Sequence, residues 1–363
     1  MKRTFVKAAL CAVALSVVAS GCGLLGGSKD PGEEAKEIST KPAQDVAPPE
    51  QVDPRASAQP GLVLSTNSRS WNGLVDSAEG PGAVVIFVQP GGPSDGKGIA
   101  RGDVITEIDG EKMINHELAI ARLRSRPGQK RELKFVKRDG SERTVSIDAK
   151  NPAGATLRQF LNPMLDANKN DAVLLFLRAQ TAGTYDANLA DVNKALELEP
   201  KFVEALTLKS SILWDHRLVD RENATKLANE ALAGWKSALD LDPDNVTALS
   251  VRSTALTALG NGAGGREDAD KTIELDSSYP RAYFAKALAF TRLNEAADAL
   301  APASVAVQLN PYNLQYFRLL AGAFVRLERK ADCVKTADAM RPFLEAQQPS
   351  LKQDADALRR ICQ

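Results

Sequence analysis

Residues that could carry out catalysis or bind a metal are few in this 363-residue chain. It holds two histidines, His116 at the start of a predicted helix and His216 directly after Asp215. Neither is followed in the sequence by a Gly-x-Ser-x-Gly or Gly-Asn/Asp-Ser-Gly turn, so a Ser-His-Asp triad is not supported. The metal-binding patterns His-Glu-x-x-His and Cys-x-x-Cys are also absent from the sequence. We therefore expect no catalytic residue, no metal and no cofactor, and a function based on binding.

A cysteine near the N-terminus is the next candidate for chemistry. Basic residues within the first seven positions precede the apolar run Ala8–Ala19, which leads into Ala19-Ser20-Gly21-Cys22 and is too short to remain as a membrane span. This segment, residues 1–22, resembles a bacterial lipoprotein signal. The resemblance implies that Cys22 is acylated, with palmitate among its acyl groups, and that the protein is held to a membrane of the cell envelope on the extracytoplasmic side. The alternative is an ordinary secretory signal cleaved near Cys22.

Cys333 and Cys362 are the thiols that remain once such a leader is removed. An even pair of cysteines in an oxidising compartment favours a disulfide. If residues 331–341 and 350–362 form antiparallel helices, the two cysteines lie at comparable distances from the turn between them, so the bond is geometrically possible. The alternative is a pair of buried thiols.

Residues 23–60 separate the leader from the folded part of the chain. They are rich in Gly, Pro, Glu, Lys, Ser and Ala and contain almost no large apolar side chains. Such a segment cannot bury enough apolar surface to fold, so we predict a disordered tether. A flexible chain of this length has a root-mean-square span of about 35 Å, which makes it a spacer above the membrane.

Residues 61–150 have the pattern of a small domain made mostly of strands. Short apolar runs separated by Gly- and Pro-rich turns predict strands, and one helix is predicted after Asn115 as its N-cap. The predicted strands are Ala83–Val88, Val104–Ile108, Arg131–Lys137 and Glu142–Asp148, and the helix is His116–Arg124.

The order of motifs in this segment resembles that of bacterial PDZ domains. Gly98-Ile99 is followed by Arg101-Gly102-Asp103, then by Ile108-Asp109-Gly110, the helix, and Lys137-Arg138-Asp139-Gly140. The resemblance implies a small, partly open β-barrel with one main helix. It also implies a binding function, because PDZ domains capture an extended C-terminal peptide as an added strand at a sheet edge.

The same resemblance assigns the residues of a peptide-binding site. Gly61-Leu62-Val63-Leu64 corresponds to the loop whose backbone N–H groups receive the terminal carboxylate. His116, Ile120 and Leu123 of the helix correspond to residues that line the groove. Alternatives stay open for each: the loop residues as a plain first strand, His116 as a solvated residue, and Leu123 as part of the core.

A basic stretch follows the helix. It consists of Arg122, Arg124, Arg126, Lys130, Arg131, Lys134, Lys137 and Arg138. Such a run is usually a solvated face, and the alternative is a flank of the groove that favours acidic ligands by charge steering.

The remainder of the chain carries an internal helical repeat. Pro243, Ser277 and Pro311 end related triplets and stand 34 residues apart, the length of a helix–turn–helix unit. Small residues recur in the same register, and the pattern resembles tetratricopeptide (TPR) repeats. This implies an all-α solenoid of four to five units over 156–342, with a capping helix over 343–363. An earlier unit fits more loosely, because Phe176 stands at a small-residue position.

TPR solenoids receive a partner on their concave face. We assign four cations on the first helices of successive units to that face, with simple solvation as the alternative: Lys209, Arg252, Lys286 and Arg318.

These features together predict a multidomain α+β protein that works by binding other proteins or peptides. Lys+Arg and Asp+Glu are equal at 46 each, so nothing in the net charge points to nucleic acid. We predict a membrane-anchored, non-catalytic adaptor of the bacterial envelope, whose PDZ domain binds one peptide while the repeats dock a second protein. The alternatives are a scaffold that self-associates through its repeats and an accessory or regulatory subunit of an envelope protease.

Overall fold

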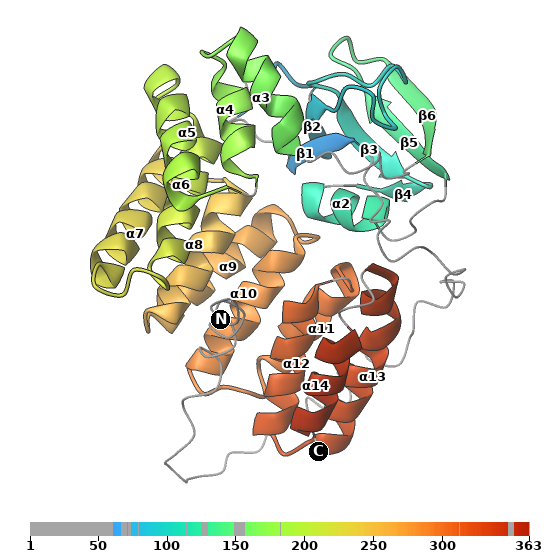
Figure 1. Ribbon diagram of the computed structural model, residues 1–363. Helices are drawn as coiled ribbons and strands as arrows, with labels where there is room; N and C mark the ends of the chain where they lie inside the picture. The colour runs from blue at the N-terminus through green and yellow to red at the C-terminus, as the bar shows by residue number, and fades with distance from the viewer. Residues whose placement is uncertain are drawn as a thin grey trace, which may run out of the picture.

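The computed structural model describes residues 61–66, 71, 74–78, 80–113, 115–124, 130–148, 157–181, 183–311, 313–347 and 352–362. The predicted signal segment, the tether and Cys22 lie outside these residues. The described chain forms an antiparallel sheet with one main helix, followed by a stack of helices (Figure 1). The predicted fold class, a small β domain followed by an all-α solenoid, is confirmed. None of the described helices has the length and apolar character needed to cross a bilayer.

The sheet has six strands, ordered β1-β2-β3-β5-β6, with β4 paired to β3. They are β1 (Leu62–Thr66), β2 (Ala83–Val88), β3 (Val104–Ile108), β4 (Glu111–Lys112), β5 (Lys130–Val136) and β6 (Glu142–Asp148), and helix α2 spans His116–Arg124. The predicted strands and helix match β2, β3, β6 and α2, and β5 lies one residue earlier than predicted. Among the described residues, β1 pairs only with β2, so its other edge carries no strand.

Both faces of the sheet are covered, which explains why β2 is apolar along its whole length. One set of alternating side chains, including Ala83 and Val85, packs with Ala119 and Leu123 of α2. The opposite set belongs to a second core that continues into the helical part of the molecule. The sheet therefore lies between α2 and the first repeat helices.

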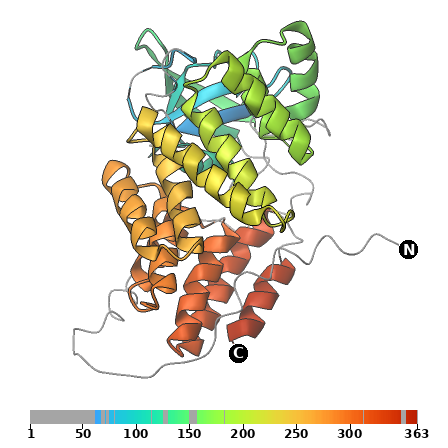
Figure 2. The ribbon, with the colours of Figure 1, turned by 90° about the vertical axis from the view of Figure 1, so that its left-hand side faces the viewer.

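Helices α3 to α14 follow the sheet. Their bounds are α3 (Leu157–Ala167), α4 (Ala172–Ala179), α5 (Tyr185–Leu198), α6 (Val203–His216), α7 (Ala224–Leu241), α8 (Val246–Ala258), α9 (Gly262–Leu275), α10 (Pro280–Arg292), α11 (Leu300–Leu309), α12 (Leu314–Arg326), α13 (Lys330–Gln347) and α14 (Lys352–Cys362). From α4 to α13 they form hairpins that stack side by side into a curved array (Figures 1 and 2). Side chains of Asp171, Thr184, Asn245, Asn261 and Asn313 cap helix N-termini.

Small residues allow the two helices of a hairpin to approach closely. A Cβ atom added at Gly265 of α9 would lie 2.0 Å from the Thr257 hydroxyl and 2.7 Å from the Ser253 carbonyl oxygen on α8. A larger residue at this position would therefore push the helices apart. The turn between these helices is short, because α8 ends at Ala258 and α9 begins at Gly262.

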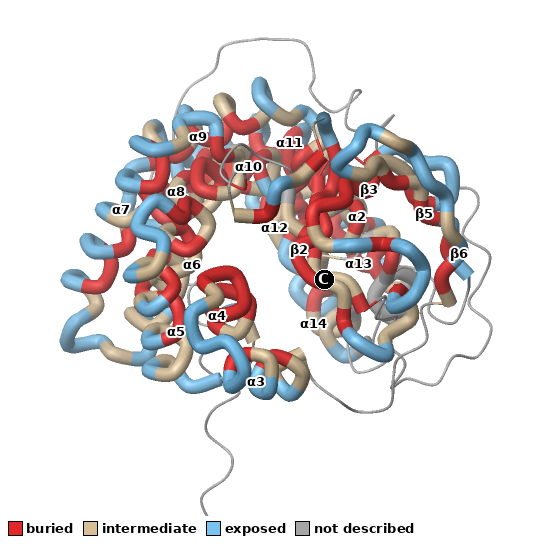
Figure 3. The backbone as a smooth tube through the Cα atoms, turned by 90° about the horizontal axis from the view of Figure 1, so that it is seen from above, coloured by how far each residue is buried: buried red, intermediate tan, exposed pale blue. Residues whose placement is uncertain are grey.

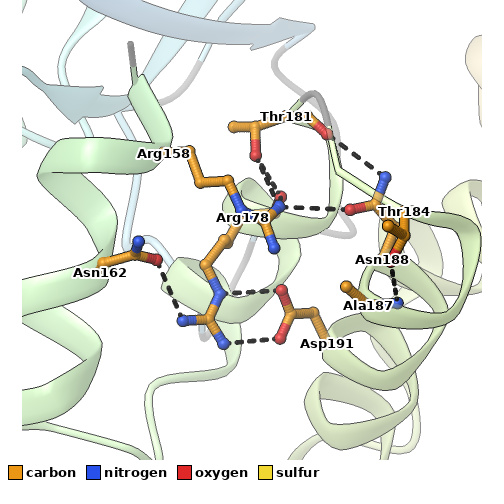
Figure 4. A network of polar contacts seen from close by, with 8 residues as sticks. All are labelled: Arg158, Asn162, Arg178, Thr181, Thr184, Ala187, Asn188 and Asp191. Atoms are coloured by element: carbon orange, nitrogen blue, oxygen red, sulfur yellow. Dashed lines mark hydrogen bonds and ion pairs between the residues drawn. The ribbon is translucent and has the colours of Figure 1, made fainter. Parts of the chain in front are cut away.

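A polar network ties the first helices together (Figure 4). Arg178 of α4 donates two hydrogen bonds to Asp191 of α5, at 2.8 and 2.7 Å, and one to Asn162 of α3. Arg158 of α3 donates to the Arg178 carbonyl oxygen and to Asn188 of α5. These bonds hold α3 against α4 and α5 at the N-terminal end of the solenoid.

The C-terminal end is fixed by a covalent bond. Cys333 of α13 and Cys362 of α14 form a disulfide with their Cα atoms 5.4 Å apart. Both cysteines are buried among apolar residues of α12, α13 and α14. Arg318 of α12 also forms an ion pair with Asp354 of α14 at 2.9 Å.

An inserted segment between β1 and β2 joins the sheet to the solenoid. Trp71 is fully buried, and its ring centroid lies 5.8 Å from that of Phe176 on α4 and 5.4 Å from that of Phe202 before α6. Its indole N–H donates to the Ser65 hydroxyl of β1 at 3.1 Å. Phe176 packs against Trp71, and this contact explains why a large side chain stands at a small-residue position of the repeat.

Seen from above, the sheet and α2 lie across from the arc of repeat helices (Figure 3).

Candidate peptide-binding site

Gly61 gives the start of β1 its shape. Its φ of +70° is in the left-handed region, which favours glycine. A Cβ atom at this position would lie 3.3 Å from both Gly92 Cα and Pro93 Cδ, so the backbone here runs against the turn after β2. The Gly61 carbonyl oxygen accepts a hydrogen bond from the Gln89 N–H at 2.7 Å, which ties the two segments together.

Apolar side chains lie beside this loop, where the sequence predicts a pocket. Leu62 and Leu64 point to the same face of β1 and belong to the cluster that contains Ile120 and Leu123 of α2. Leu62 and Ile120 are half-buried and accessible, whereas Leu64 and Leu123 are buried. Leu123 is therefore a core residue beneath the pocket. Val63 points to the opposite face and packs against the second core.

The arrangement has the two elements that strand addition needs. The unpartnered edge of β1 offers backbone N–H and C=O groups to an extended peptide, in the part of the chain that the structure describes. The accessible apolar surface of Leu62 and Ile120 can receive the side chain of its last residue. This geometry supports peptide binding.

His116, at the first position of α2, lies at the contact between the two parts of the molecule. It is half-buried. Burial, together with the positive charge of Arg281 on α10, lowers the pKa of His116 to about 4, so the imidazole is neutral at physiological pH. The sequence predicted His116 as a groove residue or a solvated one, and it gave no sign of this repeat contact.

Residues on both sides of His116 hold α2 against the solenoid. The Asn115 side-chain amide donates to Asp276 at 3.3 Å and to the Ser278 hydroxyl and carbonyl oxygens at 3.0 and 3.2 Å. The Tyr316 hydroxyl of α12 donates to the Glu117 carboxylate at 3.5 Å. Asn115, predicted as the helix cap, directly precedes α2, and its side-chain amide nitrogen reaches the turn between α9 and α10.

The basic stretch after α2 is largely neutralised by neighbouring acids. Five of its members form ion pairs: Arg122 with Glu111, Arg131 with Asp109, Lys134 with Glu107 and Glu142, Lys137 with Asp103, and Arg138 with Asp76. The side chains of Arg124 and Arg126 lie outside the described residues. These pairs favour a structural, solvated face over a charged flank of the groove.

The four cations assigned to the concave face do not form a row of unpaired charges, because three of them form ion pairs within the solenoid. Arg252 forms a bidentate pair with Asp268 of α9, at 2.7 Å for both bonds. Lys286 pairs with Asp270 of α9 at 2.7 Å, and Arg318 with Asp354. Lys209 is half-buried on α6. Within the described residues, no group of three acids, histidines or cysteines is placed to hold a metal ion.

A hollow of about 770 Å³ lies between α7, α8 and α9, away from β1 and α2. Its lining mixes both signs of charge, with Arg252 and Asp268 paired inside it. It offers no apolar pocket for a ligand.

The family comparison agrees with this site. Residues 61–149 match the family model for the PDZ domain. The chain thus contains a PDZ domain. No curated protein matches the chain.

Solved structures similar to the helical part are TPR proteins. TTC0263, a thermophilic TPR protein of Thermus thermophilus, is 18% identical, with a TM-score of 0.42, covering 55% of this chain and 98% of its own. Yeast Tom70 is 17% identical, with a TM-score of 0.44, covering 58% and 44%. YrrB, a TPR protein with an unusual peptide-binding site, is 18% identical, with a TM-score of 0.35, covering 55% and 99%. The repeat assignment itself rests on the 34-residue register and the stacked hairpins.

Together these findings define the protein as a PDZ domain followed by a TPR-like solenoid, a combination of protein-interaction modules.

Proposed function

We propose that this protein is a non-catalytic, membrane-anchored adaptor of the bacterial cell envelope that captures extended C-terminal peptides. The observation that carries the proposal is the free edge of β1 beside the Gly61 loop, with Leu62 and Ile120 accessible next to it. Backbone N–H groups of the loop receive the terminal carboxylate, and the last side chain packs on Leu62 and Ile120.

The test is binding of the full-length protein to an array of ten-residue peptides with randomised last residues. Each peptide is made with a free C-terminal carboxylate and, as its matched partner, with an amide. We expect binding only to the carboxylate forms, because the amide removes the negative charge that the loop receives. Ile120→Glu should abolish binding, since it places a charge in the apolar pocket. Val219→Glu is the control, because Val219 is 78% exposed on the solenoid. Equal binding of both peptide forms would contradict the proposal.

The anchoring part of the proposal rests on the leader and Cys22. Cys22→Ser removes the thiol that is acylated, so the variant should move from the membrane fraction to the soluble fraction of cells. Cell fractionation followed by immunoblotting measures this. Retention of the variant in the membrane fraction would count against a lipid anchor.

A second function, self-association through the repeats, is favoured by one observation. Large apolar side chains are exposed at equivalent repeat positions 34 residues apart: Leu241 and Leu275, and Leu259 and Leu293, at 38–51% exposure. Light scattering over a hundredfold range of protein concentration tests this scaffold role. A constant monomer mass would exclude it.

A further inference from the structure

The spacing of α2 and a bound strand defines where each ligand side chain lies. His116 and Ile120 are four residues apart on the helix, which corresponds to about 6 Å along its axis. In an extended peptide, side chains two residues apart share a face and are separated by about 6.6 Å. If the last ligand residue lies beside Ile120, the third residue from the end lies beside His116. The fifth residue from the end then lies beyond the start of α2.

The solenoid occupies the space beyond the start of α2. The turn between α9 and α10 is fixed there by the hydrogen bonds from Asn115 to Asp276 and Ser278. Arg281, three residues after Ser278, lies in the first turn of α10. Its positive charge lowers the pKa of His116 and opposes the burial that raises the pKa of Glu117, which agrees with this position. Figure 1 shows the start of α2 beside this end of α10.

Arg281 differs from the arginines that pair with acids inside the solenoid. Arg178, Arg252 and Arg318 each hold a carboxylate within 3 Å. Within the part of the chain that the structure describes, Arg281 forms no ion pair and no hydrogen bond through its side chain, and this side chain is exposed. Desolvation by the surrounding protein lowers the pKa of Arg281, but nearby acidic groups, Glu117 first, together outweigh this effect, so its pKa is raised and it stays charged. The Arg281 guanidinium is therefore accessible, and its N–H groups can donate hydrogen bonds to a ligand.

We propose that Arg281 of the solenoid extends the PDZ groove and binds an acidic side chain at the fifth residue from the C-terminus of the ligand. This rests on the proposed function, since it assumes that the ligand lies along β1. A guanidinium binds carboxylates through paired hydrogen bonds, and a neutral His116 does not compete for the acidic group. Ligand choice is then shared between the two modules.

The experiment uses the full-length protein and the same peptide array, in matched pairs with Glu or Gln at the fifth residue from the end. Fluorescence anisotropy gives the affinity of each pair. Wild type should prefer the Glu peptide by about fivefold, the range of a partly exposed ion pair. Arg281→Gln should remove this preference and leave the affinity for the Gln peptide unchanged, which also shows that the variant is folded. Arg281→Lys should retain part of it.

Arg292→Gln is the matched control, because Arg292 is an arginine in the last turn of the same helix, far from the start of α2. It should keep the full preference. A preference that is the same in wild type and Arg281→Gln, or none in wild type, would overturn the role of Arg281 while peptide binding itself stands. No binding to any carboxylate peptide, or binding that Ile120→Glu does not affect, would overturn the proposed function and this inference with it.

Discussion

In the proposed function, carboxylate binding depends most on Gly61. Its φ of +70° costs an L-residue about 1–2 kcal/mol, and a side chain would also meet Gly92 and Pro93. We predict that Gly61→Ala lowers stability by about this amount and weakens peptide binding at least tenfold, because the loop must move. Urea unfolding and peptide anisotropy measure the two effects.

Gly140 provides the control for this substitution. It lies in the turn between β5 and β6 at a φ of +79°, with no atom within 4 Å of an added Cβ. Gly140→Ala should therefore cost similar stability and leave peptide affinity unchanged. If both variants weaken binding equally, the effect comes from general destabilisation and the loop assignment is wrong.

His116 makes stability depend on pH. Its pKa of about 4 in the folded protein lies below the ordinary value of about 6.5 in the unfolded chain. Between these values the unfolded state binds more protons, so stability falls as pH decreases from 6.5 to 4. The loss is at most about 3 kcal/mol. Glu117 faces the same contact and titrates in the opposite sense, since burial raises its pKa, while Arg281 stays charged.

A His116→Asn variant separates these contributions. It lacks the imidazole and keeps Glu117 and Arg281, so the stability of wild type relative to the variant should decrease as pH falls from 7 to 4. Urea unfolding at a series of pH values measures the difference. A difference that does not change with pH would show that His116 is solvated, as the sequence alone allowed.

At the scale of elements, the regular parts of the chain were predictable and the contacts between them were not. Short apolar or alternating runs between turn residues predicted β2, β3 and β6, because strands buried on one or both faces leave these patterns. The 34-residue register predicted the hairpins, because each repeat must pack against its neighbours in the same way. Phe176 interrupts that register because it meets Trp71 from another element, and no local pattern carries such information.

The segment with Trp71 is the element that holds the sheet to the repeats. Trp71→Ala should lower the free energy of unfolding by about 3–5 kcal/mol, because it leaves a cavity between Phe176 and Phe202. Trp214→Ala is the comparison, because Trp214 is half-buried within the repeats. Hydrogen exchange should show lost protection in both β1 and α4 for Trp71→Ala, and in the repeats alone for Trp214→Ala. Loss confined to one side in the first variant would argue against a shared core.

At the scale of the whole molecule, the paired repeat cations and the docked α2 change the expected picture of two separate binding surfaces. The sequence predicts a peptide groove at one end and a charged trough at the other. Arg252, Lys286 and Arg318 instead pair within the solenoid. Asn115 and Glu117 join the start of the PDZ helix to the turn between α9 and α10 and to α12. The contacts that join α2 to the solenoid link residues far apart in sequence, so residue types and spacing could not reveal them.

The shared core predicts that the PDZ segment is not stable by itself. Residues 61–150 alone would expose the sheet face that carries Val84, Ile86 and Val104, which is buried against the insertion and the repeat helices. We expect this piece to aggregate or to bind a hydrophobic dye, and a piece spanning residues 61–363 to unfold in one cooperative transition. Circular dichroism and dye fluorescence compare the two. Residues 61–150 could instead fold alone and unfold at the same midpoint as the piece spanning residues 61–363. The stability of the PDZ segment would then not depend on the repeats. In that case the two modules could not share ligand choice through a fixed contact.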